Sequence, residues 1–165
     1  MHRLIVFSLI ALAGVLCPIS SGTFAQTLPP VVLQKIQAAQ QHVTTIGMED
    51  YRKVVDSPGE AIIIDVREPH EFAAGHVPGA RNHPFTLNLR ADGRMLPASD
   101  LRRHWLEFLR GEPATRVISM CGSGVTACQN LLALEVAGLP GAALYAGSWS
   151  EWIRDPARGV ARGNG

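Results

Sequence analysis

The sequence predicts an α/β fold, a doubly wound parallel sheet flanked by helices and built as a single domain. Two short apolar runs, residues 61–64 and 117–120, are typical of strands that are buried on both faces of such a sheet. Helical patterns separate the predicted strands, and the connections are short. Strands that alternate with helices in this way favour parallel pairing over hairpins.

The first half of the predicted domain alternates between the apolar patterns of strands and those of helices. We expect strands and helices in turn at residues 42–46, 48–55, 61–64, 69–74 and 80–83. Pro58 and Gly59 interrupt the chain before the first buried strand, and Asp65 ends that strand. Residues 75–79, Gly-His-Val-Pro-Gly, predict a turn.

The second half continues the same alternation. Ser99 is predicted to be the N-cap of a helix that runs to about Leu109. The strand at 117–120 and a helix ending near Gly138 follow, and then a strand at 142–145 and a last helical turn at 148–153. The tail, residues 156–165, is expected to be loose.

The N-terminal segment is expected to lie outside this domain. A basic start, an apolar run from Leu4 to Leu16 and a small residue, Ala25, at the expected cleavage point predict a signal peptide over residues 1–25. We therefore expect an exported, periplasmic protein without a membrane span in its mature chain. An uncleaved N-terminal membrane anchor is the alternative. Residues 26–41 are predicted to be a tether with a short helix at 31–41, and the domain itself to span 42–155.

Composition argues against several classes of partner. Removing 25 of the 165 residues leaves 140, and it removes one of the 15 basic residues, so 14 remain to balance 14 acidic ones. A neutral chain does not favour nucleic acid as a partner. The six histidines are scattered and the cysteines lack metal-ligand spacing, so no metal site is predicted. The oligomeric state is left open.

The sequence CGSGVTAC, residues 121–128, is the clearest chemical signal. Cys121 directly follows a predicted strand and opens a short loop that leads into a helix. Two glycines within the next three residues let backbone N–H groups turn toward the sulfur, and amides at a helix start favour an anion. Cys121 is therefore predicted to be a nucleophile or sulfur carrier. Cys128 lies in the apolar helix and is expected to pack in the core.

Four segments together resemble the rhodanese (sulfurtransferase) family. They are IIIDVREPHEF at residues 62–72, GHVPGARNHPF at 75–85, CGSGVTAC at 121–128 and YAGSWSEW at 145–152. They occur in the family's order and span most of the predicted domain. The loop is most similar to the carboxyl-terminal domain of the mercaptopyruvate sulfurtransferase branch.

The resemblance implies a double-displacement reaction. The Cys121 thiolate would take sulfur from thiosulfate or 3-mercaptopyruvate as a persulfide and pass it to a thiophilic acceptor, cyanide or a thiol. The loop residues would hold the charged sulfur through their amides, with hydroxyl groups adding donors; they are Gly122, Ser123, Gly124, Val125 and Thr126. The reaction requires no organic cofactor or metal, because sulfur itself is the group carried.

Several residues outside the loop are candidates for the site or for packing around it. Arg67 follows the first buried strand and is the candidate for holding an anionic donor, but a structural ion pair with Asp65 or Glu71 is equally open. For His76 a structural role in its turn is favoured, and for Arg81 a solvated position. Trp149 and Trp152 are expected to pack the last helix rather than line the site.

Two departures from the family pattern bear on the donor. The segment between the DVR-type and GHVPGA-type pieces, residues 68–74, is short and has no arginine. A second group that could hold the mercaptopyruvate carboxylate is therefore missing there. Ala146 also stands where the family often has Asp. Thiosulfate thus becomes at least as good a donor as 3-mercaptopyruvate.

Two other functions are compatible with a reactive cysteine at this place in the chain. A Cys-x5-Arg phosphatase needs an arginine six positions after the cysteine, and Ala127 stands there, which excludes that chemistry. A non-enzymatic sulfur-binding or partner-binding module is the second alternative. An ionisable thiol in a formed loop favours the enzyme over it.

Overall fold

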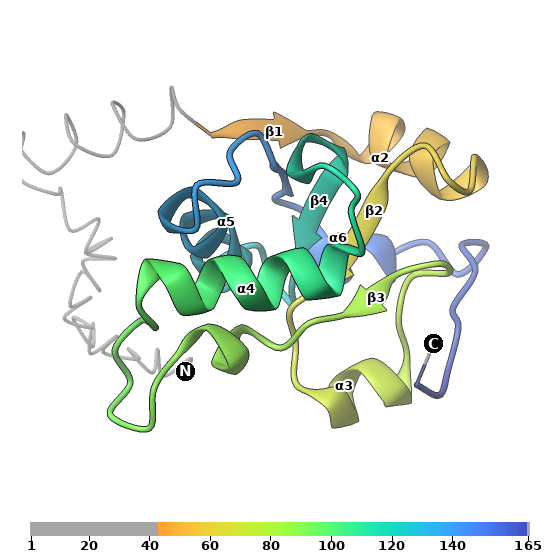
Figure 1. Cartoon of the computed structure of the whole chain (residues 1–165). Coiled ribbons are helices and arrows are strands. Elements are labelled where there is room, and N and C mark those ends of the chain that lie inside the picture. The colour runs from red at the N-terminus through yellow and green to blue at the C-terminus, as the bar shows by residue number, and fades with distance from the viewer. Residues whose placement is uncertain (1–42, 165) are drawn as a thin grey trace, which may run out of the picture.

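The computed structural model describes residues 43–164, which contain a five-stranded sheet (Figure 1). The strands are β1 (Thr44–Ile46), β2 (Ile62–Asp65), β3 (Arg81–Asn82), β4 (Val117–Met120) and β5 (Ala143–Tyr145). Their order in the sheet is β1-β5-β4-β2-β3, and every neighbouring pair is parallel. The predicted doubly wound parallel sheet is confirmed.

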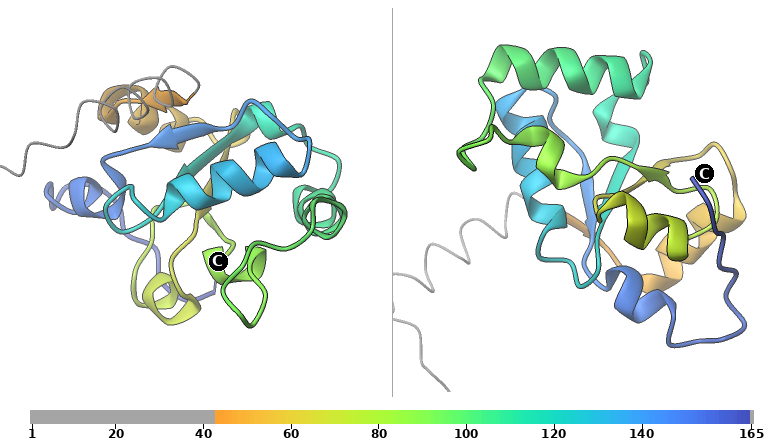
Figure 2. Two further views of the ribbon diagram at one scale, coloured as in Figure 1. Left: turned by 90° about the vertical axis from the view of Figure 1, so that its left-hand side faces the viewer. Right: turned by 90° about the horizontal axis from the view of Figure 1, so that it is seen from below.

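Helices cover both faces of the sheet (Figure 2). They are α2 (Met48–Asp56), α3 (Pro69–Ala74), α4 (Ala98–Leu109), α5 (Ala127–Val136) and α6 (Ser148–Trp152), with short 3₁₀ turns η1 (Phe85–Asn88) and η2 (Ala114–Arg116). Helices α4 and α5 pack on one face, and α2, α3 and α6 contribute to the cluster on the other. Among residues 43–164, no helix is both long enough and apolar enough to cross a membrane.

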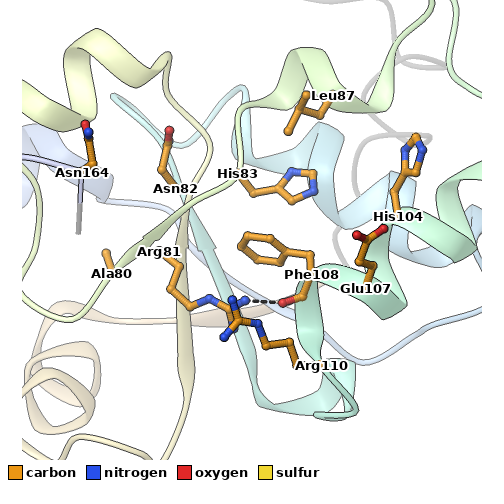
Figure 3. A pocket seen from close by; sticks show the side chains of 10 residues that line it. All are labelled: Ala80, Arg81, Asn82, His83, Leu87, His104, Glu107, Phe108, Arg110 and Asn164. Carbon is orange, nitrogen blue, oxygen red and sulfur yellow. Dashed lines mark hydrogen bonds between the residues drawn. The ribbon is translucent and has the colours of Figure 1, made fainter.

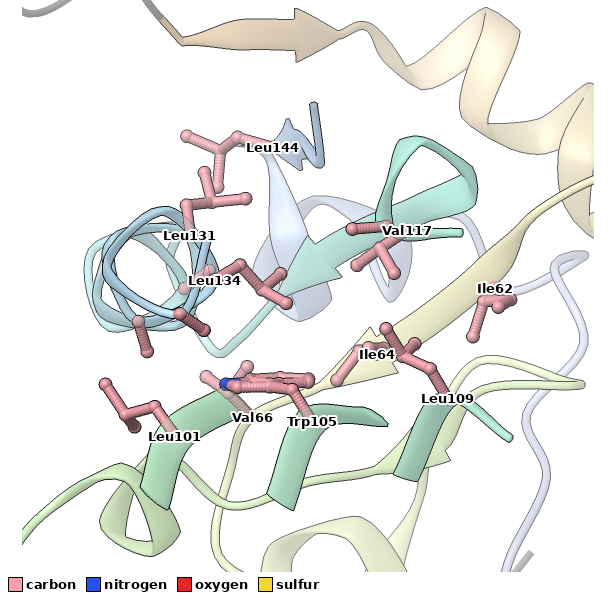
Figure 4. Close-up of a cluster of buried hydrophobic side chains, with 14 of the residues drawn as sticks. Ile62, Ile64, Val66, Leu101, Trp105, Leu109, Val117, Leu131, Leu134 and Leu144 are labelled. Carbon is pink, nitrogen blue, oxygen red and sulfur yellow. The ribbon is translucent and has the colours of Figure 1, made fainter. Parts of the chain in front are cut away.

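The residues of β2 alternate between these two faces. Ile62 and Ile64 point toward α4 and α5, where Trp105 is fully buried in the cluster that Figure 4 shows. Ile63 points to the opposite face and packs in the cluster that contains Tyr51. Because both faces are covered, the strand is apolar at three consecutive positions instead of alternating with polar residues.

The second cluster contains three large aromatic rings. Tyr51 of α2 stacks on Tyr145 of β5 with ring centroids 3.9 Å apart. Trp152 of α6 meets Tyr51 edge-on at 5.8 Å. This packing fixes α6 against the end of β5, and α6 in turn holds the loop that begins at Cys121.

The start of α4 differs from the prediction. The helix begins at Ala98, with Pro97 at the N-cap position in an extended conformation, so Ser99 lies inside the first turn and caps nothing. Proline's restricted φ suits entry into a helix, and it stops the helix from starting earlier.

The tail also differs from the prediction. His76 and Ala161 exchange two backbone hydrogen bonds of 2.9 Å each, and the indole of Trp152 donates to the carbonyl of Gly159 at 2.9 Å. The expectation of a loose tail is therefore wrong for residues 156–164. The pairing with His76 joins this segment to a residue far away in sequence, which its Gly- and Arg-rich composition does not reveal.

Candidate active site

Cys121 is the first residue after β4, at the carboxyl edge of the sheet. It lies beside the end of β2, because Asp65 is paired with Met120 and the amide of Val66 donates to the Met120 carbonyl at 2.9 Å. The chain leaves the adjacent strands β2 and β4 toward opposite sides of the sheet, which creates the crevice where ligands bind in open α/β sheets. Cys121 is 2% exposed and therefore lies at the bottom of this crevice.

The loop after Cys121 turns back over the sulfur. The backbone amide of Gly124 donates a hydrogen bond to Sγ of Cys121 at 3.1 Å. Gly122, Ser123 and Thr126 line the cavity in front of the sulfur. The side chain of Val125 points outward and is 76% exposed. Of the five predicted loop residues, Val125 alone neither lines the cavity nor donates its amide to the sulfur.

Gly124 is required by both its conformation and its surroundings. Its φ is +87°, in the left-handed region that L-residues rarely adopt. A Cβ atom at this position would lie 2.3 Å from the carbonyl oxygen of Ala146. The backbone of residue 146 thus approaches the loop so closely that only glycine allows the amide of residue 124 to reach the sulfur.

Helix α6 holds the other side of the loop, a role that sequence reasoning missed. The amide of Cys121 donates to Oγ of Ser148 at 3.1 Å, and the Cys121 carbonyl accepts from the amide of Trp149 at 3.0 Å. The Gly122 carbonyl accepts from both the amide and the hydroxyl of Ser150, at 2.9 and 2.6 Å. The YAGSWSEW segment was the available signal, but its two serines were not assigned a function.

Arg67 forms the ion pair that the sequence left open. Its guanidinium donates to both carboxylate oxygens of Asp65, with the shortest contact at 2.5 Å from Nη2, and Nη2 also donates to the Gly75 carbonyl at 2.8 Å. The guanidinium lies 4.7 Å from the ring centroid of Trp149. Arg67 nevertheless also lines the cavity in front of Cys121, and its Nη1 hydrogen-bonds to none of the described residues.

The cavity in front of Cys121 is small, about 180 Å³. Val66 and Phe85 form its apolar wall, and Arg67 contributes a positive charge. Glu68 and Glu71, at the start of α3, add two carboxyl groups to the lining, and one oxygen of Glu71 accepts from the amide of Glu68 at 3.2 Å. The cavity therefore fits a compact molecule that can use one cation and backbone amides.

A larger cavity, about 790 Å³, lies between β3 and α4 (Figure 3). His83 in its wall stacks on Trp105 with centroids 4.1 Å apart, and burial lowers the pKa of His83 to about 4. Arg81 lies over the ring of Phe108 and donates to the Phe108 carbonyl, so it is packed on α4 rather than solvated as expected. The described residues that line this cavity include no cysteine, and it does not open on Cys121.

His76, Trp149 and Trp152 have structural roles, as expected. His76 is buried, with Nδ1 2.8 Å from the Phe72 carbonyl, and its ring stacks on that of Phe72, which confirms a structural role. Trp152 packs in the core, and Trp149 packs against it and against Arg67. Neither tryptophan lines the cavity at Cys121.

The prediction for Cys128 was wrong. Cys128 is a free thiol on the exposed side of α5, and its Sγ lies 3.5 Å from the carbonyl of Gly124. Partial burial and the charge of nearby Cys121 raise the pKa of the Cys128 thiol. Helix α5 carries apolar residues on its outer side as well as on its buried side, so its hydrophobicity could not show which side faces the sheet.

These features define a class of protein: a parallel α/β domain with a buried, amide-bonded cysteine at the carboxyl edge of its sheet. The profile of the rhodanese-like domain family matches residues 48–155. The chain therefore belongs to the rhodanese family, and the resemblance found in its motifs is confirmed.

Named relatives come from bacteria and animals. The chain is 55% identical over 97 residues to a Pseudomonas aeruginosa protein named "Probable 3-mercaptopyruvate sulfurtransferase", covering 59% of this chain and 34% of that protein. It is 34% identical over 134 residues to the 3-mercaptopyruvate sulfurtransferase of Escherichia coli K12, covering 79% and 45%. It is 29% identical over 134 residues to the thiosulfate sulfurtransferase of Gallus gallus, covering 81% and 45%. The chain thus spans between a third and a half of these relatives.

Solved structures agree in fold. The Tum1 protein of Saccharomyces cerevisiae superposes with a TM-score of 0.62 at 23% identity, covering 73% of this chain and 47% of that one. A variant of EanB in complex with ergothioneine superposes with a TM-score of 0.63 at 17% identity, covering 72% and 32%. At these identities the similarity establishes the fold alone.

Proposed function

We propose that this protein is a sulfurtransferase in which Cys121 carries the transferred sulfur atom. The observation that carries the proposal is the Gly124 amide, which donates to the Cys121 sulfur at the closed end of a cavity that Arg67 also lines. A donor aimed at this sulfur stabilises negative charge on it, and a persulfide anion needs the same stabilisation one atom further out. The relatives, all named sulfurtransferases, support this assignment.

With thiosulfate as donor, the reaction is a displacement at sulfur. The Cys121 thiolate attacks the outer sulfur, an S–S bond forms to Cys121, and the S–S bond of thiosulfate breaks to release sulfite. The negative charge moves to the outer sulfur of the Cys121 persulfide. Cyanide or a thiolate then attacks that outer sulfur, which returns Cys121 as a thiolate and releases thiocyanate or a new persulfide.

With 3-mercaptopyruvate, the C–S bond breaks instead. The thiolate attacks the mercapto sulfur, the electron pair of the C–S bond passes to the carbon, and the mercapto proton ends on that carbon to give pyruvate. Both donors are small anions, and Arg67 is the cation that lines the cavity. Nη1 of Arg67, which Asp65 does not engage, is the group that we assign to donor binding.

We further propose that the protein is exported to the periplasm after cleavage near Ala25. The support comes from residues 1–25, where a basic residue precedes a short apolar run; these residues lie outside the described part of the chain. Sequencing the N-terminus of the protein from a periplasmic fraction tests this proposal. A start at or near Gln26 is expected, and an intact Met1 in the membrane fraction would establish the anchored form instead.

The enzymatic proposal is tested by steady-state rates. Thiosulfate and 3-mercaptopyruvate are each assayed with cyanide and with a dithiol as acceptor, using the parent, Cys121→Ser and Cys128→Ser. Turnover with at least one donor that is lost in Cys121→Ser and kept in Cys128→Ser supports the proposal. Equal rates in the parent and in Cys121→Ser would overturn it, and no turnover by the folded parent with any pair would favour the binding module.

A further inference from the structure

Helix α5 is apolar on two opposite sides. Leu131 and Leu134 point into the core and are 7% and 1% exposed. On the outer side, Val125 just before the helix, Leu132 and Val136 are 76%, 55% and 41% exposed, and Cys128 lies between them. These four residues, which we call the outer face of α5, follow one another at intervals of three, four and four positions. That spacing is typical of a helix face that packs against another helix.

A groove runs along this outer face. It encloses about 510 Å³ and is lined by Val43, Cys128, Leu131, Leu132, Glu135 and Ala142. Val43 is the first described residue, so the preceding chain enters the domain at the wall of this groove. Glu135 is the charged residue in the lining.

The segment that precedes Val43 has a matching pattern. Val32, Ile36 and Ala39 follow one another at intervals of four and three, which places them on one side of a helix, and Leu33 lies beside them. The residues on the opposite side are polar. Lys35 is the charged residue of the segment, opposite in sign to Glu135.

We propose that residues 31–41 form a helix that lies in this groove and covers the outer face of α5. Ile36 and its apolar neighbours contact Leu132 and Val136, and Lys35 lies within reach of Glu135. The lengths agree, because eleven helical residues span about 16 Å and the ten residues of α5 about 15 Å.

Covalent continuity favours this segment over a second copy as the occupant. Residue 42 alone separates the predicted helix from the wall of the groove. Such a short connection gives an effective concentration in the millimolar range or above, which a separate molecule reaches only at very high protein concentration. The consequence is chemical: Cys128 becomes shielded, and Cys121 is left as the thiol that small donors and acceptors reach.

The reactivity of Cys128 tests the proposal. The whole chain is produced with Cys17→Ser and Cys121→Ser, so that Cys128 is its only thiol whether or not the leader is removed. The rate of Cys128 alkylation by iodoacetamide is then measured in three chains. They are this parent, the parent with Ile36→Asp and, as a control, the parent with Gln34→Asp. Ile36 is on the apolar side of the predicted helix and Gln34 on the opposite side, and both variants add the same charge.

We expect Ile36→Asp to speed alkylation of Cys128 by at least about tenfold and Gln34→Asp to change it by less than about twofold, because only the first opens the groove. Ile36→Asp and Gln34→Asp are also made in a chain that keeps Cys121. Their sulfur-transfer rates should equal the rate of the unsubstituted chain, which would show that the domain remains folded. Equal alkylation rates in all three chains would overturn the proposal. So would protection of Cys128 that disappears on dilution together with a sedimenting dimer, since a second copy would then be the occupant.

Discussion

The hydroxyl of Ser148 accepts a hydrogen bond of 3.1 Å from the backbone amide of Cys121, although 27 positions separate the two residues. Ser148 is fully buried, has a φ of +53° and donates its own hydroxyl proton to the carbonyl of Tyr145 at 2.9 Å. The hydroxyl therefore links the first residue of the active loop to the end of β5. The position of the Cys121 sulfur depends on packing around α6 as well as on its own loop.

Removing this hydroxyl should misplace the nucleophile. We expect Ser148→Ala to lower kcat/KM for sulfur transfer by about tenfold, which corresponds to about 1.4 kcal/mol, the value of one or two lost hydrogen bonds. Ser150→Ala is the control, because its amide still donates to the Gly122 carbonyl. The expected loss there is less than about threefold. If both variants lose the same activity, Ser148 has no special positioning role.

Gly124 and Gly122 provide a matched pair in the loop. Gly124→Ala would place a methyl group 2.3 Å from the Ala146 carbonyl at a φ of +87°, whereas a methyl group at Gly122 would have no atom within 4 Å. We expect Gly124→Ala to reduce the rate of persulfide formation by about a hundredfold or more, because the loop must move and the amide leaves the sulfur. Gly122→Ala should stay within about threefold of the parent. Stopped-flow sulfite release from thiosulfate measures both, and equal rates would show that the amide is not needed.

The ion pair of Arg67 and Asp65 can be separated from donor binding. Asp65 is fully buried, so Arg67→Gln leaves an uncompensated carboxylate and should cost about 3–5 kcal/mol of unfolding free energy in urea titrations. The double variant Arg67→Gln/Asp65→Asn should recover much of that stability. Its KM for an anionic donor should remain about tenfold or more above that of the parent, because the cation is still absent. A KM restored to the parent value would mean that Arg67 is structural alone.

The stability of the domain should depend on His83 below neutral pH. Burial lowers the pKa of His83 to about 4, against 6.5 for an exposed histidine. Between these values the unfolded chain binds a proton that the folded chain does not, so stability falls as the pH drops from about 6.5 toward 4. From pH 7.5 to 5 the loss attributable to His83 is about 2 kcal/mol. In urea unfolding, the drop in unfolding free energy from pH 7.5 to 5 should be smaller in His83→Phe than in the parent by about this amount. The same drop in both proteins would contradict the assignment.

Much of the fold follows from local sequence signals. Helix α3 spans Pro69–Ala74 as expected, because Pro69 suits the first turn and Gly75 ends the helix. Strand β2 was recognisable because Ile62, Ile63 and Ile64 are consecutive and apolar, as burial on both faces requires. The position of Cys121 between a strand and a helix followed from the same reasoning.

The remaining features depend on contacts that local patterns do not show. The partners of Cys121 on α6 and the approach of Ala146 to Gly124 come from a different strand and helix. Cys128 was misassigned because α5 is apolar on both sides. The sequence also could not decide between an ion pair and donor binding for Arg67. The structure shows the ion pair with Asp65, and Arg67 also lines the cavity in front of Cys121.

The most direct measurement is the intact mass of the folded protein after incubation with thiosulfate or 3-mercaptopyruvate and removal of excess donor. The account predicts that the parent and Cys128→Ser gain the mass of one sulfur atom with at least one of these donors, and that Cys121→Ser does not. Added cyanide should remove the gained sulfur atom. A sulfur atom retained in Cys121→Ser, or none gained by the folded parent with either donor, would contradict the assignment of Cys121 as the sulfur carrier.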